Sequence, residues 1–258
     1  MNTPVEALGM QLKPLQRWES LLFFGFPTLL MLVSVYFILP SLTSLGASEY
    51  LGLQLASLIP YLTLFVGALV AYRREKNPWS WTAFRDRFRL HRLGAQDWLW
   101  VLALIIFSFA SYLILRSLVS TLVSNNFVVL PTSVPRIIDP RLQLSLEELA
   151  DGTLKGNWLL VAISVLVLFF NIFGEELWWR GYLLPRQEVV YGRSAWIVHG
   201  LLWTFFHIFK YWELIAILPV SLALSFVVQY RRNTWFGILA HLAVNSLGTI
   251  GLVLSVIG

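Results

Sequence analysis

The chain of 258 residues has no cysteine and little charge. The missing cysteines exclude disulfides, thiolate metal ligands and a cysteine nucleophile. Charged residues make up 13% of the chain, whereas a soluble globular domain carries about a quarter. Hydrophobic residues, in contrast, reach 57%. The composition therefore predicts an integral membrane protein rather than one or two soluble domains.

Long apolar stretches are the main feature that the sequence does contain. A helix needs about 20 apolar residues to cross a bilayer, and seven stretches approach that length. They predict an all-α, polytopic bundle of about seven to eight transmembrane helices. The seven stretches are Leu21–Pro40, Leu51–Tyr72, Trp98–Leu115, Trp158 to about Trp179, Ser194–Phe209, Leu214–Tyr230 and Asn233–Ile257.

The basic residues are distributed unevenly between the two sides of the predicted bundle. With the N-terminus inside, 14 of the 19 lysines and arginines fall on the cytoplasmic side. The positive-inside rule therefore predicts a cytoplasmic N-terminus, and we expect the cell membrane as the location. The net charge of +5 reflects this topology, so no nucleic-acid partner is expected. The five basic residues of the other side are Arg116, Arg136, Arg141, Lys155 and Lys210.

Two connections are long enough for structure of their own. Residues 73–97 carry Trp81, Phe84 and Phe88 on one helical face among arginines, which predicts a short helix on the cytoplasmic surface. The outer loop, residues 123–157, carries Ser145 and Glu148 at the spacing of a capping box, which predicts a short helix there.

Ionisable residues within membrane spans are costly and indicate function by default. Few such residues lie away from the ends of the predicted spans, and one asparagine accompanies them as an uncharged partner. They are Glu175, Glu176, Arg180, His199, His207, His241 and Asn245.

In the segment GEELWWRG, helical spacing predicts different roles for the two glutamates. Glu176 and Arg180 are four residues apart on one helical face, where the glutamate neutralises the arginine. Glu175 is rotated by about 100° from Glu176 and shares a face with Asn171 and Trp179. An apolar environment disfavours the charged form of a carboxyl group. A carboxyl group in such an environment is suited to proton transfer near neutral pH. Glu175 is therefore the predicted catalytic carboxylate.

Two further pairs repeat the spacing of four on later helices. Trp203 and His207 form the first pair, and His241 and Asn245 form the second. Histidine and asparagine can donate hydrogen bonds to an oxyanion, and histidine can bind a metal. At about 1.5 Å per residue, Glu175, His207 and His241 lie at similar depths of roughly 14 to 21 Å. We therefore expect these residues to converge on one site.

Structural interpretations of the same residues remain open at this point. Glu175 and Glu176 could mark a helix end at the interface, with Arg180 extending toward the headgroups. The mid-membrane histidines and asparagine, taken singly, could join helices by hydrogen bonds. His199 has no polar neighbour of note on its helix and is interpreted as structural.

These residues resemble the motifs of the CAAX protease and bacteriocin-processing (CPBP, or Abi) family of intramembrane proteases. Its motifs are EExxxR, FxxxH and HxxxN, in this order on successive helices. Glu175, Glu176 and Arg180 match the first, His207 the second, and His241 with Asn245 the third. Position 203 is tryptophan where the family usually has phenylalanine, and we expect this change to affect packing before chemistry.

The resemblance covers about residues 155–255 and implies both a fold and an activity. It implies a helical membrane bundle around a polar cavity, with residues 1–154 as N-terminal helices and loops and residues 155–258 as the catalytic core. It implies peptide-bond hydrolysis, in which Glu175 and His207 activate water and His241 and Asn245 stabilise the oxyanion. Glu176, Arg180 and Trp203 would then support the site.

A metal-dependent mechanism is an alternative that the sequence leaves open. The family has also been described as metalloproteases, and Glu175, His207 and His241 could supply three zinc ligands with an open position. The chain lacks HExxH, the usual zinc-protease pattern. Zinc therefore remains a candidate cofactor.

Three classes of function compete at the level of sequence. The leading prediction is an intramembrane endopeptidase that acts on a lipidated or membrane-associated peptide, with the bilayer as its environment. A catalytically silent immunity or binding scaffold is the second. A proton-coupled membrane carrier is the third, because buried Glu, His and Arg residues also form proton relays.

Overall fold

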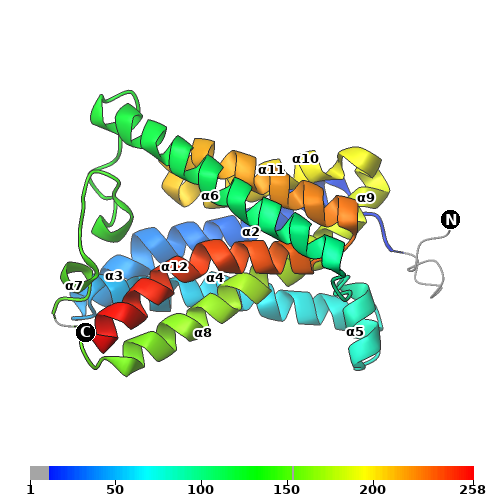
Figure 1. The fold of residues 1–258 in the computed structure, drawn as a ribbon, viewed down its shortest axis with the longest axis horizontal. Coiled ribbons are helices and arrows are strands. Elements are labelled where there is room, and N and C mark those ends of the chain that lie inside the picture. The colour runs from blue at the N-terminus through cyan, green and yellow to red at the C-terminus, as the bar shows by residue number, and fades with distance from the viewer. Residues whose placement is uncertain (1–11, 153) are drawn as a thin grey trace.

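The computed structural model describes residues 12–152 and 154–258, and every regular element within these ranges is helical (Figure 1). The long helices run roughly side by side along one direction, and short elements gather at the two ends of the bundle. The elements are α2 (Arg17–Val33), η1 (Ser34–Ile38), α3 (Leu39–Ser44), α4 (Glu49–Arg74), α5 (Trp81–Arg87), α6 (Ala95–Ser124), η2 (Arg136–Ile138), α7 (Leu146–Leu149), α8 (Trp158–Glu175), η3 (Glu176–Leu183), α9 (Leu184–Tyr191), η4 (Gly192–Ser194), α10 (Ala195–Phe206), η5 (His207–Glu213), α11 (Leu214–Arg231) and α12 (Trp235–Ile257).

Five segments of the described chain are long and apolar enough to cross a membrane: Arg17–Ser44, Glu49–Arg74, Ala95–Ser124, Trp158–Arg231 and Trp235–Ile257. The all-α membrane class is thereby confirmed, while the predicted count of seven to eight spans is not. The predicted fourth, fifth and sixth spans all lie within Trp158–Arg231. Non-helical backbone interrupts this segment at Gly192, between α9 and α10, and at Lys210, between α10 and α11. Within it α10 has only 12 residues, about 18 Å of helix, which is short of a hydrocarbon core of about 30 Å.

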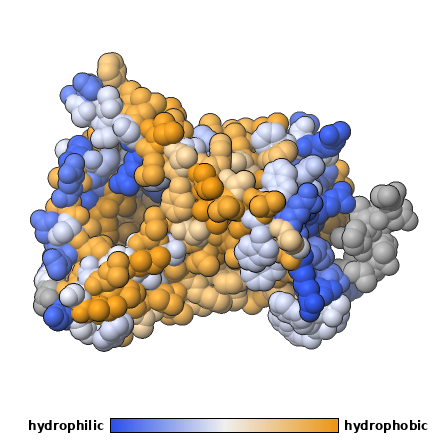
Figure 2. All heavy atoms as spheres, in the orientation of Figure 1, coloured by the Kyte–Doolittle hydropathy of each residue, from blue (hydrophilic) through white to orange (hydrophobic). Residues whose placement is uncertain are grey.

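The outer surface is apolar where lipid would contact it. Leu21, Phe37, Leu99, Ile114 and Leu159 each expose more than half of their area. Figure 2 shows hydrophobic residues over the middle of the molecule and hydrophilic residues toward its ends. A soluble protein would not expose so continuous an apolar surface, so this is an integral membrane protein.

Close helix contacts bring the later helices onto α4 and onto each other. A Cβ at Gly174 would lie 2.5 Å from the carbonyl oxygen of Tyr61, so α8 approaches α4 backbone to backbone. A Cβ at Gly200 would lie 3.1 Å from Cα of Leu222, so α10 also approaches the backbone of α11 closely. Small residues at such crossings are the usual means of helix association in membranes.

The two short helices predicted in the connections are present. Helix α7 begins with a capping box, in which Ser145 Oγ accepts from the backbone N–H of Glu148 and the Glu148 side chain accepts in return. Helix α5 carries the predicted aromatic face, but its residues differ in environment. Trp81 is 65% exposed, whereas Phe88 is fully buried against Tyr72 and under Gly181. The connection is therefore docked on the core beside the helix that bears the glutamates.

Candidate active site

The helix that carries Glu175 continues past Arg180, as the predicted site requires. Helix α8 passes into the π-helical segment η3 and then into α9, which ends at Tyr191. A π-helical turn accommodates an extra residue per turn and is common at functional sites. Arg180 lies in this segment with its side chain fully buried.

Glu176 is the partner of Arg180, and it also holds a histidine. Arg180 Nη1 donates to Glu176 Oε1 at 3.0 Å, and His241 Nδ1 lies 3.0 Å from the same oxygen. Both side chains of the Glu176–Arg180 pair are fully buried. Gly237 makes room for this carboxylate, because a Cβ there would lie 2.1 Å from Glu176 Oε2. The predicted spacing of four thus produces a buried ion pair that links η3 to α12.

Arg180 makes its second contact through the face of its guanidinium group. The group lies 3.8 Å from the ring centroid of Trp203, in cation–π geometry. Its Nε and Nη2 atoms have no hydrogen-bond partner within the described residues. The charge of Arg180 is therefore met by one carboxylate and one aromatic ring, and neither contact uses Glu175.

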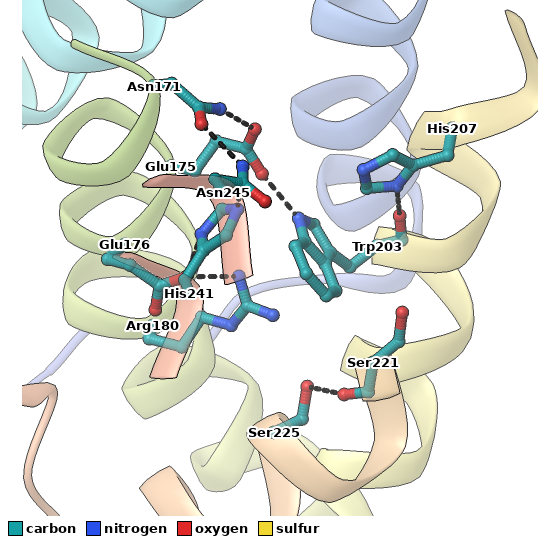
Figure 3. A network of polar contacts seen from close by, with 10 residues as sticks. All are labelled: Asn171, Glu175, Glu176, Arg180, Trp203, His207, Ser221, Ser225, His241 and Asn245. Carbon is teal, nitrogen blue, oxygen red and sulfur yellow. Dashed lines mark hydrogen bonds and ion pairs between the residues drawn. The ribbon is translucent and has the colours of Figure 1, made fainter. Parts of the chain in front are cut away.

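Glu175 is a buried carboxylate that is held by two neutral donors (Figure 3). Asn171 Nδ2 donates to its Oε1 at 2.8 Å, and Trp203 Nε1 donates to its Oε2 at 2.7 Å. Only 2% of the residue is exposed. The partner Asn171 lies one turn earlier on the face predicted for Glu175. Trp179, predicted on the same face, stacks on Phe24 instead, with centroids 4.3 Å apart.

The amide of Asn245 joins the histidine of its own helix to Asn171. Asn245 Nδ2 donates to Asn171 Oδ1 at 2.7 Å and lies 3.0 Å from His241 Nε2. If His241 Nδ1 donates to the Glu176 carboxylate, Nε2 carries the lone pair that accepts from Asn245. A chain of hydrogen bonds then runs from Glu175 through both asparagines to His241.

His207 borders this network without a direct bond to Glu175. Its Nδ1 lies 2.9 Å from the carbonyl oxygen of Trp203, and because a carbonyl only accepts, Nδ1 carries the hydrogen. Nε2 then presents a lone pair, and no described residue hydrogen-bonds to it. In Figure 3 this free nitrogen points toward the side on which Glu175 and Asn245 lie. Asn245 is exposed and His207 partly so, which leaves this side open.

The structure brings together almost all of the site residues predicted from sequence, and adds one. Glu175, Glu176, Arg180, Trp203, His241 and Asn245 form one contact network. His207 adjoins it through the backbone of Trp203. Asn171 completes the network but was not among the predicted site residues. Its position four residues before Glu175 was the available signal.

His199 lies elsewhere, in an environment that fits the structural interpretation. Its Nδ1 is 2.6 Å from Gln187 Oε1, and its ring packs edge-on against Phe24. These contacts tie α10 to α9 and α2.

The residues proposed as zinc ligands do not fit a metal ion in this arrangement. No group of three His, Cys, Asp or Glu residues in the described chain is close enough to hold one. The oxygens of Glu175 accept from Asn171 and Trp203, and the two ring nitrogens of His241 face Glu176 and Asn245. His207 Nε2 is the one ligand atom among the three residues without a hydrogen-bond partner in the described chain.

Fold and site together define an integral membrane protein with a buried carboxylate, histidine and amide network. Residues 157–247 match the family model described as type II CAAX prenyl endopeptidase Rce1-like. Within these residues the match confirms the resemblance found in the three motifs, and the matched family is one of proteases. The matched segment contains every site residue named above. A search of curated proteins and a search of solved structures each found no match.

Proposed function

We propose that the chain is an intramembrane endopeptidase that hydrolyses a peptide bond by means of a water molecule activated by Glu175. One observation carries the proposal. Glu175 is the only carboxylate of the described network without a cationic partner, because Glu176 takes both Arg180 and His241. A buried carboxylate held in place by neutral donors is suited to act as a general base.

Glu175 has the hydrogen-bonding capacity that the reaction requires. Each of its oxygens accepts one bond in the protein and keeps a second lone pair for a water hydrogen. The water oxygen attacks the scissile carbonyl carbon while its proton passes to Glu175. Collapse of the tetrahedral intermediate breaks the C–N bond, and Glu175 returns the proton to the leaving nitrogen. The carboxylate is regenerated at the end of the cycle.

His207 and Asn245 are placed to assist from the open side. The free Nε2 lone pair of His207 can accept the second hydrogen of the attacking water. Asn245 can donate to the oxyanion by exchanging one of its two present contacts, with Asn171 or with His241. His241 lies between Glu176 and Asn245, so it orients the amide. These roles belong to the proposal together with that of Glu175.

The substrate class follows from the location of the site and from the family. The network lies on helices of an integral membrane protein, so a substrate must reach it from the bilayer or its surface. CAAX proteases act on membrane-associated prenylated proteins. We infer that the substrate is a lipidated or membrane-associated polypeptide.

Cleavage by the purified, detergent-solubilised chain tests the proposal. Wild type and Glu175→Gln would be compared on a panel of lipidated and membrane-spanning peptides, with and without a chelator. Glu49→Gln is the matched control, because this carboxylate is also mostly buried, lies 3.9 Å from the exposed Arg136 and contacts no residue of the network. We expect Glu175→Gln to lose about 10²- to 10⁴-fold in rate while the control retains activity.

The possible outcomes separate the competing functions. If Glu175→Gln cleaved as fast as the wild type, Glu175 would not be the general base. Cleavage that chelator abolishes and zinc restores would instead support a metalloprotease. Absence of cleavage across the panel, together with Glu175-dependent ion flux in liposomes, would assign the chain to the carriers. If neither the wild type nor Glu175→Gln cleaved any peptide and both produced the same cellular phenotype, the chain would be a catalytically silent immunity or binding scaffold.

A further inference from the structure

A second polar concavity lies apart from the Glu175 network. It is a cavity of about 460 Å³ between the end of α9, the start of α10 and the end of α11. It shares no lining residue with the network, and the proposed reaction does not use it. Its lining residues are Glu188, Gly192, Arg193, Trp196, Phe226, Gln229, Tyr230 and Arg232.

Gln229 gives this cavity a preformed polar floor. Its Oε1 accepts from the backbone N–H of Trp196 at 2.7 Å, and its Nε2 donates to the Gly192 carbonyl at 3.0 Å. One side chain thus ties the end of α11 to the start of α10. Such bonds hold the cavity open without a ligand, which lowers the cost of binding one.

Two arginines at the cavity have no ionic partner among residues 12–152 and 154–258. The side chains of Arg193 and Arg232 are exposed and make no ion pair or hydrogen bond with any described residue. Arg232 also ends α11 in the left-handed conformation, with φ of 50°, where glycine or asparagine is favoured.

The other charges near the cavity are neutralised. Both guanidinium nitrogens of Arg89 that face Glu188 donate to its carboxylate, at 2.6 and 2.8 Å. The neighbour of Arg232 in the chain, Arg231, pairs with Asp97. The cavity therefore has two unmatched positive charges and no free carboxylate, which favours an anion and disfavours the cationic amine of a zwitterionic headgroup.

Aromatic side chains form the wall of the cavity. Trp196 meets Phe226 edge to face at 5.4 Å, and Phe226 stacks on Tyr230 at 5.8 Å. Tyr230 is 62% exposed. Trp196 is partly buried, and tryptophan and tyrosine are enriched at the level of the lipid headgroups in membrane proteins.

An apolar stripe leads away from the cavity along α10. Ile197, Leu201 and Phe205 follow one another at intervals of four residues and are 40%, 51% and 49% exposed. The stripe begins one residue after Trp196. A ligand with its charge in the cavity could therefore lay an acyl chain on this surface, which a free phosphate ion could not do.

We propose that this cavity binds the headgroup phosphate of an anionic phospholipid, with the acyl chains along the α10 stripe. The guanidinium groups of Arg193 and Arg232 bind the phosphate oxygens, for which arginine geometry is well suited. Basic cavities between membrane helices recognise anionic headgroups by this chemistry. The bound lipid would lie beside α10, the helix that carries Trp203.

Native mass spectrometry of the purified full-length chain tests the proposal. Phosphatidylglycerol and phosphatidylcholine with identical acyl chains would be titrated onto wild type, Arg193→Gln/Arg232→Gln and Arg74→Gln/Arg92→Gln. The second pair is the matched control, because Arg74 and Arg92 are also exposed, also lack a partner among the described residues and do not line the cavity. We expect wild type and the control pair to prefer phosphatidylglycerol, and Arg193→Gln/Arg232→Gln to lose roughly 30-fold in affinity for it.

Three results would overturn the proposal. Equal phosphatidylglycerol affinity in wild type and Arg193→Gln/Arg232→Gln would remove the role of the two arginines. An equal loss in the control pair would indicate a general surface charge effect. If an equimolar amount of inorganic phosphate displaced the lipid, the cavity would be a site for a soluble anion and not for a phospholipid. Glu175→Gln should bind the lipid like wild type, which keeps this test independent of the proposed peptidase activity.

Discussion

Trp203 shows how one residue can change the chemistry of a motif. The family usually has phenylalanine at the corresponding position, and sequence alone predicted a difference in packing. In the structure its indole N–H donates to Glu175 at 2.7 Å, and its ring faces Arg180. Trp203 therefore contacts both the carboxylate that we propose as the base and the buried cation.

Replacement of Trp203 by phenylalanine tests this positioning role. The ring remains, while the donor to Glu175 is lost. A hydrogen bond to a charged group contributes about 1.5–3 kcal/mol, so we expect kcat to fall about 10- to 150-fold with KM little changed. Steady-state kinetics on the peptide that the wild type cleaves would measure both constants.

Trp212→Phe is the matched control for this substitution. Trp212 is also buried, at 3% exposure, but its Nε1 has no hydrogen-bond partner among the described residues. We expect this variant to cleave like the wild type. An increase in KM with unchanged kcat in Trp203→Phe would contradict positioning and indicate a packing contact with substrate.

Glu176→Gln is predicted to damage stability more than Glu175→Gln does. Loss of the Glu176 charge leaves Arg180 buried without its carboxylate and gives His241 a neutral amide oxygen in place of a charged acceptor. Breaking a buried ion pair in this way costs about 3–5 kcal/mol. Thermal unfolding in detergent would show a lower Tm for Glu176→Gln than for Glu175→Gln. Equal Tm values with equal loss of activity would contradict the division of tasks between the two glutamates.

At the scale of elements, the site depends on how closely α12 approaches η3. Gly237 of α12 faces Glu176, and Gly174 at the end of α8 faces the backbone of α4. These glycines let the helices meet closely enough for His241 and Asn245 to reach the residues of α8 and η3. Glu176 and Arg180 both lie in the π-helical segment η3.

Gly237→Ala tests this close approach. The added Cβ would lie 2.1 Å from Glu176 Oε2 and 3.3 Å from Leu224 Cδ2, so the carboxylate must move away from Arg180 and His241. We expect a loss of about 1–3 kcal/mol in unfolding free energy, typical of overpacking, and a fall in activity. Denaturation in detergent and the cleavage assay would measure the two effects.

Gly248→Ala is the control on the same helix. A Cβ at Gly248 would meet nothing within 4 Å, so we expect this variant to match or slightly exceed the wild type in stability. If both alanine variants behaved alike, the close contact at Gly237 would not matter to the site.

At the scale of the whole molecule, the orientation in the membrane is a prediction that the absence of cysteine makes easy to test. Thr82 lies on α5, and Ser133 lies in the loop before η2, and both are exposed. With a cytoplasmic N-terminus, Ser133→Cys should react with a membrane-impermeant maleimide in intact cells, and Thr82→Cys should react only after permeabilisation. The reverse pattern would contradict the positive-inside assignment.

Some features of this protein could be predicted from residue pattern alone because their causes are local. The Glu176–Arg180 pair depends on a spacing of four on one helix, and the capping box at Ser145 depends on a spacing of three. The membrane class depends on long apolar stretches. Asn171 could have been included in the site for the same reason, since it precedes Glu175 by one turn.

Other features depend on contacts between segments far apart in the chain. The partners of His241 and Trp203 are Glu176 and Glu175, on another helix, and spacing along one helix says nothing of the distance between two. Sequence gave no sign that Trp203 would act through its N–H, or that His207 would contact the backbone of Trp203 rather than Glu175. The seven to eight spans were also predicted from the length of the apolar stretches, which does not reveal that α10 has only 12 residues.

The sequence by itself determined that this chain enters a membrane and that its polar residues at depth recur at a spacing of four, because composition and helical spacing are properties of the chain. The resemblance of these residues to three protease motifs is likewise visible in the sequence. Only the tertiary structure decided how those motifs are connected. The approach of α12 and α10 to η3 leaves Glu176 with two cationic or donor partners and Glu175 with two neutral ones. That difference arises from helix packing in three dimensions, and it is the basis for assigning the base to Glu175.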